Sequence, residues 1–275
     1  MLAQALSSED AYRLSLLQEG QFTPSSMAEH IGRHPGLAWH VPGTREYAIG
    51  GYWRHRPDIG FILESSSGRH WPLLYERVVA TYERLGVRLV LLDHPERMRH
   101  LGQYKDRGFT VIDEIVQCER NNCRVALAPA PRLSVRPYVP THQAAVLAVE
   151  RESFSWLWWN STDELDWYVA QPGARIFVGC EGWGAGGGSR VVGYVGATLN
   201  GDHGHIDRLA VRGKHQRAGH GTELLAFILG FMDGAGVKRV TLTTQSDNYP
   251  AQVLYAKFGF HRTLLRFPFY GKWLT

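Results

Sequence analysis

The first half of the chain alternates short apolar runs with segments of helical periodicity. Between Trp71 and Leu85, hydrophobic residues recur three and four positions apart, which predicts a helix with one buried face. Gly86 ends this helix, and the continuous apolar run at 87–92 is typical of a buried strand. The same patterns predict further helices over 3–17 and 95–104 and strands over 46–53, 59–64 and 110–118. From the strand at 59–64 onward, the predicted order is strand, helix, strand, helix, strand.

The second half repeats this order. Its hydrophobic patterns predict strands over 133–136, 176–180, 191–199, 206–211, 239–244 and 263–269. They also predict helices over 141–151, 161–170, 250–258 and from 222 onward. The hexapeptides at 104–109 and 255–260 are similar, which indicates a duplicated domain. The Pro/Ala-rich stretch 126–131 predicts a linker between domains at 1–125 and 132–275. We therefore expect an α/β (α+β) fold of two tandem modules, each a mixed central sheet flanked by helices.

One turn in the second half has the pattern of an anion-binding site. A predicted strand ending at Val211 leads through Gly219 and Gly221 into an apolar, buried helix. The first turn of a helix has backbone N–H groups without partners, and glycines let a phosphate approach them. A pyrophosphate would fit this turn. The glycine-rich stretch 182–189 has no helix after it, so we expect a hairpin loop there instead.

These residues resemble a known family. The run from Gln216 to Gly221 is similar to the Q/R-x-x-G-x-G/A acetyl-CoA signature of the GNAT superfamily of N-acetyltransferases, and Asn248 and the segment 254–260 resemble two further elements of that family, in the same order. The resemblance implies acetyl-CoA as co-substrate, bound by Leu209, Ala210, Val211, Gln216, Arg217, Ala218, Gly219, His220, Gly221, Thr222 and Asn248. Asn248 also fits a helix N-cap, which leaves its role open.

The first module departs from this pattern. Between its strand at 59–64 and its helix from Trp71 it carries three serines, at 65–67, without the signature spacing. We expect these serines to cap the helix in preference to forming a second cofactor site, and we expect the first module to be a degenerate partner. Whether the first module binds a ligand is open.

The resemblance also implies the chemistry. An amine attacking a thioester needs a general base, a stabilised oxyanion and an acid for the departing thiolate. Tyr255 occupies the position of the family's thiolate-protonating tyrosine, and backbone N–H groups near 209–211 would hold the oxyanion. His205 and Asp207, expected on one strand face together with Leu209 and Val211, are the candidate bases. A packing role for Tyr255, a solvated strand face for the other two, and a water-relayed or absent base remain open.

The acceptor is the least defined part. Trp156, Trp158 and Trp159 lie between two predicted helices, in a region that overlies the acceptor site in the family. They would form either an aromatic wall for a cationic acceptor or packing between domains. As a hypothesis, the first module shapes the acceptor cleft.

Composition narrows the class of protein. With 44% hydrophobic and 20% charged residues, the chain is typical of a soluble globular protein. Its net charge of +4 comes without a long basic run, so we expect no nucleic-acid partner. Cys118, Cys123 and Cys180 have poor zinc spacing, which indicates reduced thiols and no metal. Because we find no signal peptide or membrane-spanning run, we expect a cytoplasmic protein without a membrane partner.

The leading hypothesis is an acetyl-CoA-dependent N-acetyltransferase acting on a small-molecule or peptide amine. A non-catalytic acyl-CoA-binding module is one alternative. Another is a tandem-module aminoacyl transferase that takes its donor from charged tRNA, which the intact run from Gln216 to Gly221 disfavours.

Overall fold

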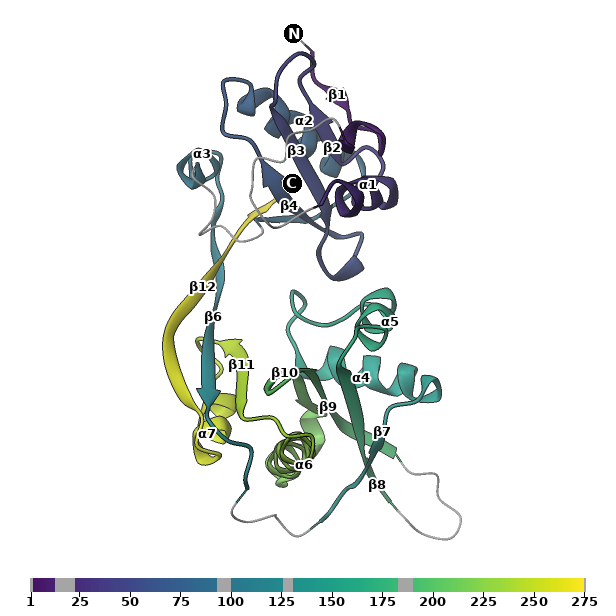
Figure 1. Ribbon diagram of the computed structural model, residues 1–275, viewed down its shortest axis with the longest axis vertical. Coiled ribbons are helices and arrows are strands. Elements are labelled where there is room, and N and C mark those ends of the chain that lie inside the picture. The colour runs from purple at the N-terminus through teal and green to yellow at the C-terminus, as the bar shows by residue number, and fades with distance from the viewer. Residues whose placement is uncertain (1, 13–22, 93–99, 126–130, 183–189, 275) are drawn as a thin grey trace. The chain divides into compact units, whose positions relative to one another are not determined.

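The computed structural model describes residues 2–12, 23–92, 100–125, 131–182 and 190–274. Their contacts divide the chain into two compact units, residues 1–114 with 267–275, and residues 115–266. Strands β6 (Thr110–Arg120) and β12 (His261–Trp273) each run from one unit into the other (Figure 1). Packing therefore divides the chain differently from the linker predicted at 126–131, most of which lies outside the described residues. The end of the first sequence module at this linker therefore stays a prediction.

The N-terminal unit is a mixed sheet covered by helices. Its strand order is β1-β2-β3-β4-β5-β12, with β4 and β5 parallel. The strands are β1 (Gln4–Ala5), β2 (Ala38–His40), β3 (Tyr47–Tyr52), β4 (Ile59–Ser65) and β5 (Leu89–Leu92), and the helices are α1 (Pro24–Arg33), α2 (Trp71–Arg84) and α3 (Leu101–Lys105). The strands expected over 46–53 and 59–64 and the helix expected from Trp71 are confirmed.

The helix predicted over 3–17 is wrong where the structure describes it. Gln4 and Ala5 form a strand paired with β2, and residues 13–17 lie outside the described residues. The Asp10 carboxylate accepts hydrogen bonds from the backbone N–H of Ser7, at 2.9 Å, and from its hydroxyl, at 2.7 Å. Such side-chain bonds to nearby backbone compete with helix formation and favour a turn.

The C-terminal unit has the strand order β6-β11-β10-β9-β8-β7. Its strands are β7 (Ser134–Pro137), β8 (Ala174–Glu181), β9 (Arg190–Asn200), β10 (His203–Val211) and β11 (Arg239–Gln245), and its helices are α4 (Gln143–Ser153), α5 (Thr162–Val169), α6 (His220–Gly234) and α7 (Tyr249–Lys257). Helices α4 and α5 share one apolar core with the sheet, and α6 and α7 share the core on its other face (Figure 1).

The two units have one topology. In each, an antiparallel pair with a bulge (β3–β4, β9–β10) is followed by a helix and a parallel strand (β4–β5, β10–β11). The last strand of each predicted module pairs within the other compact unit: residues 115–120 of β6 pair with β11, and residues 271–273 of β12 pair with β5. The two predicted modules therefore exchange their last strands.

The similar hexapeptides have the same local structure. Tyr104 and Tyr255 each accept a hydrogen bond at the backbone oxygen, at 3.1 Å, from the N–H of the phenylalanine five positions later. The ring centroids of each pair, Tyr104–Phe109 and Tyr255–Phe260, are 5.3 and 6.0 Å apart. This agreement supports the duplication that the sequence indicates.

A glutamate side chain lies at the start of α2 in the N-terminal unit. The Glu46 carboxylate accepts hydrogen bonds from the backbone N–H of His70 and from its ring Nδ1, both at 2.8 Å, at the start of α2. A Cβ atom on Gly68 would lie 2.3 Å from that carboxylate. The expected serine cap is wrong, since Ser66 bonds to the backbone of Tyr47 instead. An internal carboxylate therefore fills this position.

Candidate functional site

The turn between β10 and α6 exposes the start of a helix to an anion. Gly219 is the N-cap of α6 with φ 91°, and it makes no side-chain cap bond. Arg217, with φ 61°, also lies in the left-handed region. The first N–H groups of α6 therefore point out of the turn without a capping side chain, and the helix dipole is positive there. This end of the helix is suited to a phosphate.

Two neighbouring residues hold the turn in place. The Arg132 guanidinium donates to the backbone oxygen of Ala218 at 2.6 Å. The Gln216 side chain donates to the backbone oxygen of Val211 at 3.0 Å, which ties the turn to the end of β10. A Cβ atom on Gly221 would meet Leu254 of α7 at 3.4 Å, so α7 lies against the start of α6. The structure thus brings 209–211, 216–222 and α7 together.

Strands β10 and β11 separate beside this turn. They pair from His203–Arg239 to Ile206–Leu242, whereas β10 stays paired with β9 as far as Val211. The β11-facing edge of residues 207–211 is therefore beyond the parallel pairing. Backbone N–H groups on such an edge can bind an extended ligand or an oxyanion.

A bulge at Asp207 changes the faces of β10. Ile206 pairs with Ala197 and Arg208 with Gly196, so Asp207 is the extra residue. Leu209 and Val211 consequently pack in the α6 core, whereas Asp207 reaches Tyr168 of α5 on the other face. The expectation that Leu209 and Val211 share a face with the candidate bases is wrong, because a bulge breaks strict alternation.

His205 and Asp207 have different partners. His205 Nδ1 lies 2.8 Å from the Thr241 hydroxyl, and the same hydroxyl lies 3.2 Å from His203 Nε2. Burial lowers the pKa of His205, the Asp207 carboxylate opposes this shift, and His203 adds to it. Asp207 Oδ2 accepts from the Tyr168 hydroxyl at 2.7 Å and from the Thr198 hydroxyl at 2.8 Å.

Tyr255 lies in the core between the sheet, α6 and α7. Burial raises the pKa of its phenol above the usual value, and proximity to Cys118 adds to the shift. The phenol is therefore protonated at neutral pH and can act as a proton donor. Asn248 caps α7, because its Oδ1 accepts from the N–H of Ala251 at 3.3 Å.

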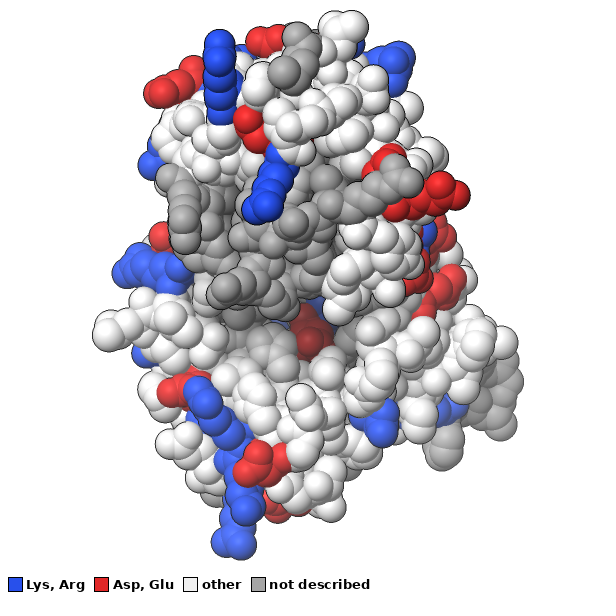
Figure 2. Space-filling model, turned by 45° about the horizontal axis from the view of Figure 1, so that its top comes forward, with Lys and Arg blue, Asp and Glu red and all other residues white. Residues whose placement is uncertain are grey.

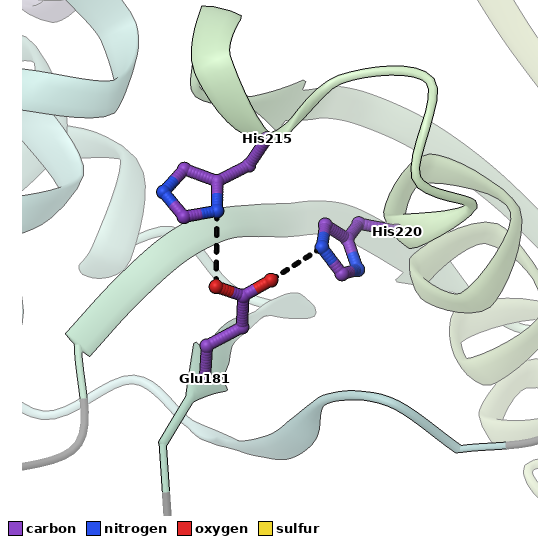
Figure 3. Close-up of side chains that lie close together, drawn as sticks. All are labelled: Glu181, His215 and His220. Atoms are coloured by element: carbon purple, nitrogen blue, oxygen red, sulfur yellow. Dashed lines mark ion pairs between the residues drawn. The ribbon is translucent and has the colours of Figure 1, made fainter.

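Sequence analysis missed one cluster beside the turn. Glu181, at the end of β8, lies between His215, which directly precedes the signature, and His220, which lies within it (Figure 3). The histidines were visible next to the glycines. Glu181 is distant in sequence, so no local pattern connects it to them.

On the face drawn in Figure 2, lysine and arginine side chains are scattered among acidic and neutral ones. In the described part of the chain, no helix has the length and apolar character that crossing a membrane requires. Cys118, Cys123 and Cys180 are buried and free.

The comparisons with known proteins give one family match and several matches of fold. A model of the acetyltransferase (GNAT) family matches residues 143–260. No curated protein matches the chain. A solved GCN5-related N-acetyltransferase from Sphaerobacter thermophilus is 17% identical, at a TM-score of 0.59, with 99% of this chain and 95% of that chain covered. A GCN5-related N-acetyltransferase from Kribbella flavida is 13% identical, at a TM-score of 0.70, with coverages of 99% and 70%.

A third structure matches the tandem arrangement. It is a tandem GNAT protein from the clavulanic acid biosynthesis pathway, 13% identical at a TM-score of 0.56, with 98% of each chain covered. At these identities the structural matches show the fold alone. Together with the family model they confirm the predicted two-module α/β architecture.

Proposed function

Because residues 143–260 match the model of the acetyltransferase (GNAT) family, we propose that the protein transfers an acetyl group from acetyl-CoA to a primary amine. The observation that carries the proposal is the uncapped start of α6 beside the edge where β10 separates from β11. One feature binds a pyrophosphate, and the other binds the extended arm that follows it.

The cofactor would be bound mainly by backbone. The N–H groups of residues 219–222 would hold the pyrophosphate, and residues 209–211 would bind the pantetheine. The thioester would then lie where β10 and β11 separate, within reach of both faces of the sheet. This explains how a base on the α5 face and Tyr255 in the α6 core can serve one reaction.

The chemistry follows from these positions. His205 Nδ1 is engaged by Thr241, which leaves Nε2 to take a proton from the amine. The amine attacks the thioester carbonyl, backbone N–H groups at 209–211 hold the oxyanion, and Tyr255 protonates the departing thiolate. Asp207 is the weaker candidate base, because its Oδ2 already accepts two hydrogen bonds. We assign it to orienting Tyr168 and Thr198.

Substituting His205 and Asp207 one at a time should show which of them is the general base. The variant His205→Gln is expected to lower kcat/KM by about 10²-fold or more, as loss of a general base does, whereas Asp207→Asn keeps most activity. Because burial lowers the pKa of His205, the parent stays active below pH 6.5 and loses activity only at more acidic pH. This acidic limb should be absent from the His205→Gln profile. If Asp207→Asn loses more activity than His205→Gln, the assignment is reversed.

The function itself is tested by thiol release. The full chain is incubated with acetyl-CoA and a panel of small amines and peptide amines, and free CoA and acetylated product are measured together. Acetylated amine formed in step with CoA supports the proposal. Tight binding of acetyl-CoA without turnover on any amine would favour the acyl-CoA-binding module. Transfer from aminoacyl-tRNA, without acetyl-CoA binding, would favour the aminoacyl transferase.

A further inference from the structure

Three side chains with metal-binding atoms meet beside the signature turn. Glu181 Oε2 lies 3.0 Å from His215 Nδ1, and Glu181 Oε1 lies 2.5 Å from His220 Nε2. The three ligand atoms all lie within 4.8 Å of one another. Figure 3 shows both rings turned toward the same carboxylate.

The donor set suits a particular class of ion. Two imidazoles and one carboxylate are the ligands of many zinc sites, with bonds of about 2.0–2.2 Å to nitrogen or oxygen. In a tetrahedral site such bonds place neighbouring ligand atoms ~3.4 Å apart. The separations between Glu181 and the two histidines would therefore need to widen by less than ~1 Å to admit an ion.

Hydrogen bonding alone accounts poorly for the burial of these rings. The side chain of His220 is 4% exposed and that of His215 is 17% exposed. His215 Nε2 and His220 Nδ1 are buried and have no hydrogen-bond partner among the described residues. Burying unpaired polar atoms is unfavourable, and metal ligation through the other two nitrogens would offset it.

Solvent can reach the cluster from one side. The side chain of Glu181 is 35% exposed, so the carboxylate of the cluster is in contact with solvent. Three ligands with one open position is a common zinc arrangement.

We propose that Glu181, His215 and His220 bind one divalent transition-metal ion, with zinc as the best fit. The ion joins the end of β8, the turn after β10 and the first residue of α6. Because His220 lies between Gly219 and Gly221, the ion fixes the geometry of the turn that faces the anion. This site is separate from the cysteines, whose spacing gave no reason to expect a metal, and it holds whether or not the protein acetylates amines.

The test uses the full chain after chelation and dialysis. Zn²⁺ is titrated by calorimetry, Co²⁺ by visible absorption, and thermal unfolding is recorded with and without Zn²⁺. We expect one ion per chain, a Co²⁺ spectrum with the intense bands of four-coordination, and a midpoint raised by about 5–10 °C at a hundredfold excess over Kd. Absence of saturable Zn²⁺ binding, or a spectrum of solvated Co²⁺, would overturn the proposal.

Variants identify the ligands. Glu181→Gln, His215→Ala and His220→Leu should each weaken Zn²⁺ binding by more than about tenfold. The matched control is His261→Ala, which removes a surface histidine lying 3.4 Å from Glu119 and should bind Zn²⁺ as the parent does. Glu181→Gln changes a partly exposed residue, so it decides the question if the buried His220 variant does not fold. Binding equal to the parent in all three ligand variants would place the ion elsewhere.

Discussion

Replacing Tyr255 with phenylalanine is expected to lower kcat about 10²–10⁴-fold, the range for loss of a general acid. Burial holds the phenol protonated at neutral and mildly alkaline pH, so the parent enzyme carries the proton that the thiolate needs. The ring itself packs against Phe260 and the α6 core, and phenylalanine keeps that packing. Binding of acetyl-CoA should therefore change little.

Steady-state kinetics and acetyl-CoA calorimetry on the folded variant check this prediction. The matched control is Tyr104→Phe, at the equivalent position of the N-terminal unit, where the hydroxyl contacts Ser65 at 2.6 Å. That variant should retain kcat. A Tyr255→Phe enzyme with the kcat of the parent would show that the thiolate takes its proton from another donor.

Replacing Arg208 with methionine is expected to reduce the free energy of unfolding by about 3–5 kcal/mol. The guanidinium donates to Glu150 Oε2 at 2.7 Å and to the Trp158 backbone oxygen at 2.6 Å. It also lies 4.2 Å from the Phe154 ring centroid. Glu150 is 0% exposed, so the substitution leaves a carboxylate buried without its cation. The Arg208 network also holds the tryptophan segment 156–159 to β10, next to the candidate base.

Urea unfolding of the parent and the variant measures the loss. Arg212→Met is the control, since the Arg212–Glu152 pair, at 3.2 Å, includes a carboxylate that is 43% exposed. The Arg212 side chain is itself only 13% exposed, but the exposed carboxylate can be solvated without its cation, so we expect a loss of about 1 kcal/mol or less. Equal losses in the two variants would contradict the account of the buried pair.

Local sequence patterns predicted most of the helices and strands, but they did not predict how strands distant in sequence pair with one another. The periodicity from Trp71 and the apolar run before Gly86 were sufficient for a helix and a strand. The exchange of β6 and β12 was not predictable, because apolar alternation does not say which neighbour a strand pairs with. The helix predicted over 3–17 was wrong because the spacing of apolar residues is helical there, whereas the polar side chain of Asp10 bonds to the backbone of Ser7 and favours a turn.

In the candidate site, too, local features could be predicted from the sequence and features that join distant segments could not. The turn from Gln216 to Gly221 was readable because glycine spacing and the following helix are local. The bulge at Asp207 could not be predicted from the sequence, and because of it Leu209 lies on the face opposite to that of Asp207. Two glutamates were missed because each contacts residues that are distant in sequence. Glu181 lies beside His215 and His220, and Glu46 lies at the start of α2.

Calorimetric titration of the full chain with acetyl-CoA, beside the double variant Gly219→Asp, Gly221→Asp, shows whether the turn before α6 binds the cofactor. Gly221→Ala is the control, since its added methyl makes an ordinary contact with Leu254 and the signature accepts alanine there. We predict saturable binding at one site in the parent and in Gly221→Ala, and a loss of more than about 100-fold in affinity in the folded double variant, whose carboxylates occupy the anion position. Equal affinity in the parent and the double variant would show that this turn does not hold the cofactor.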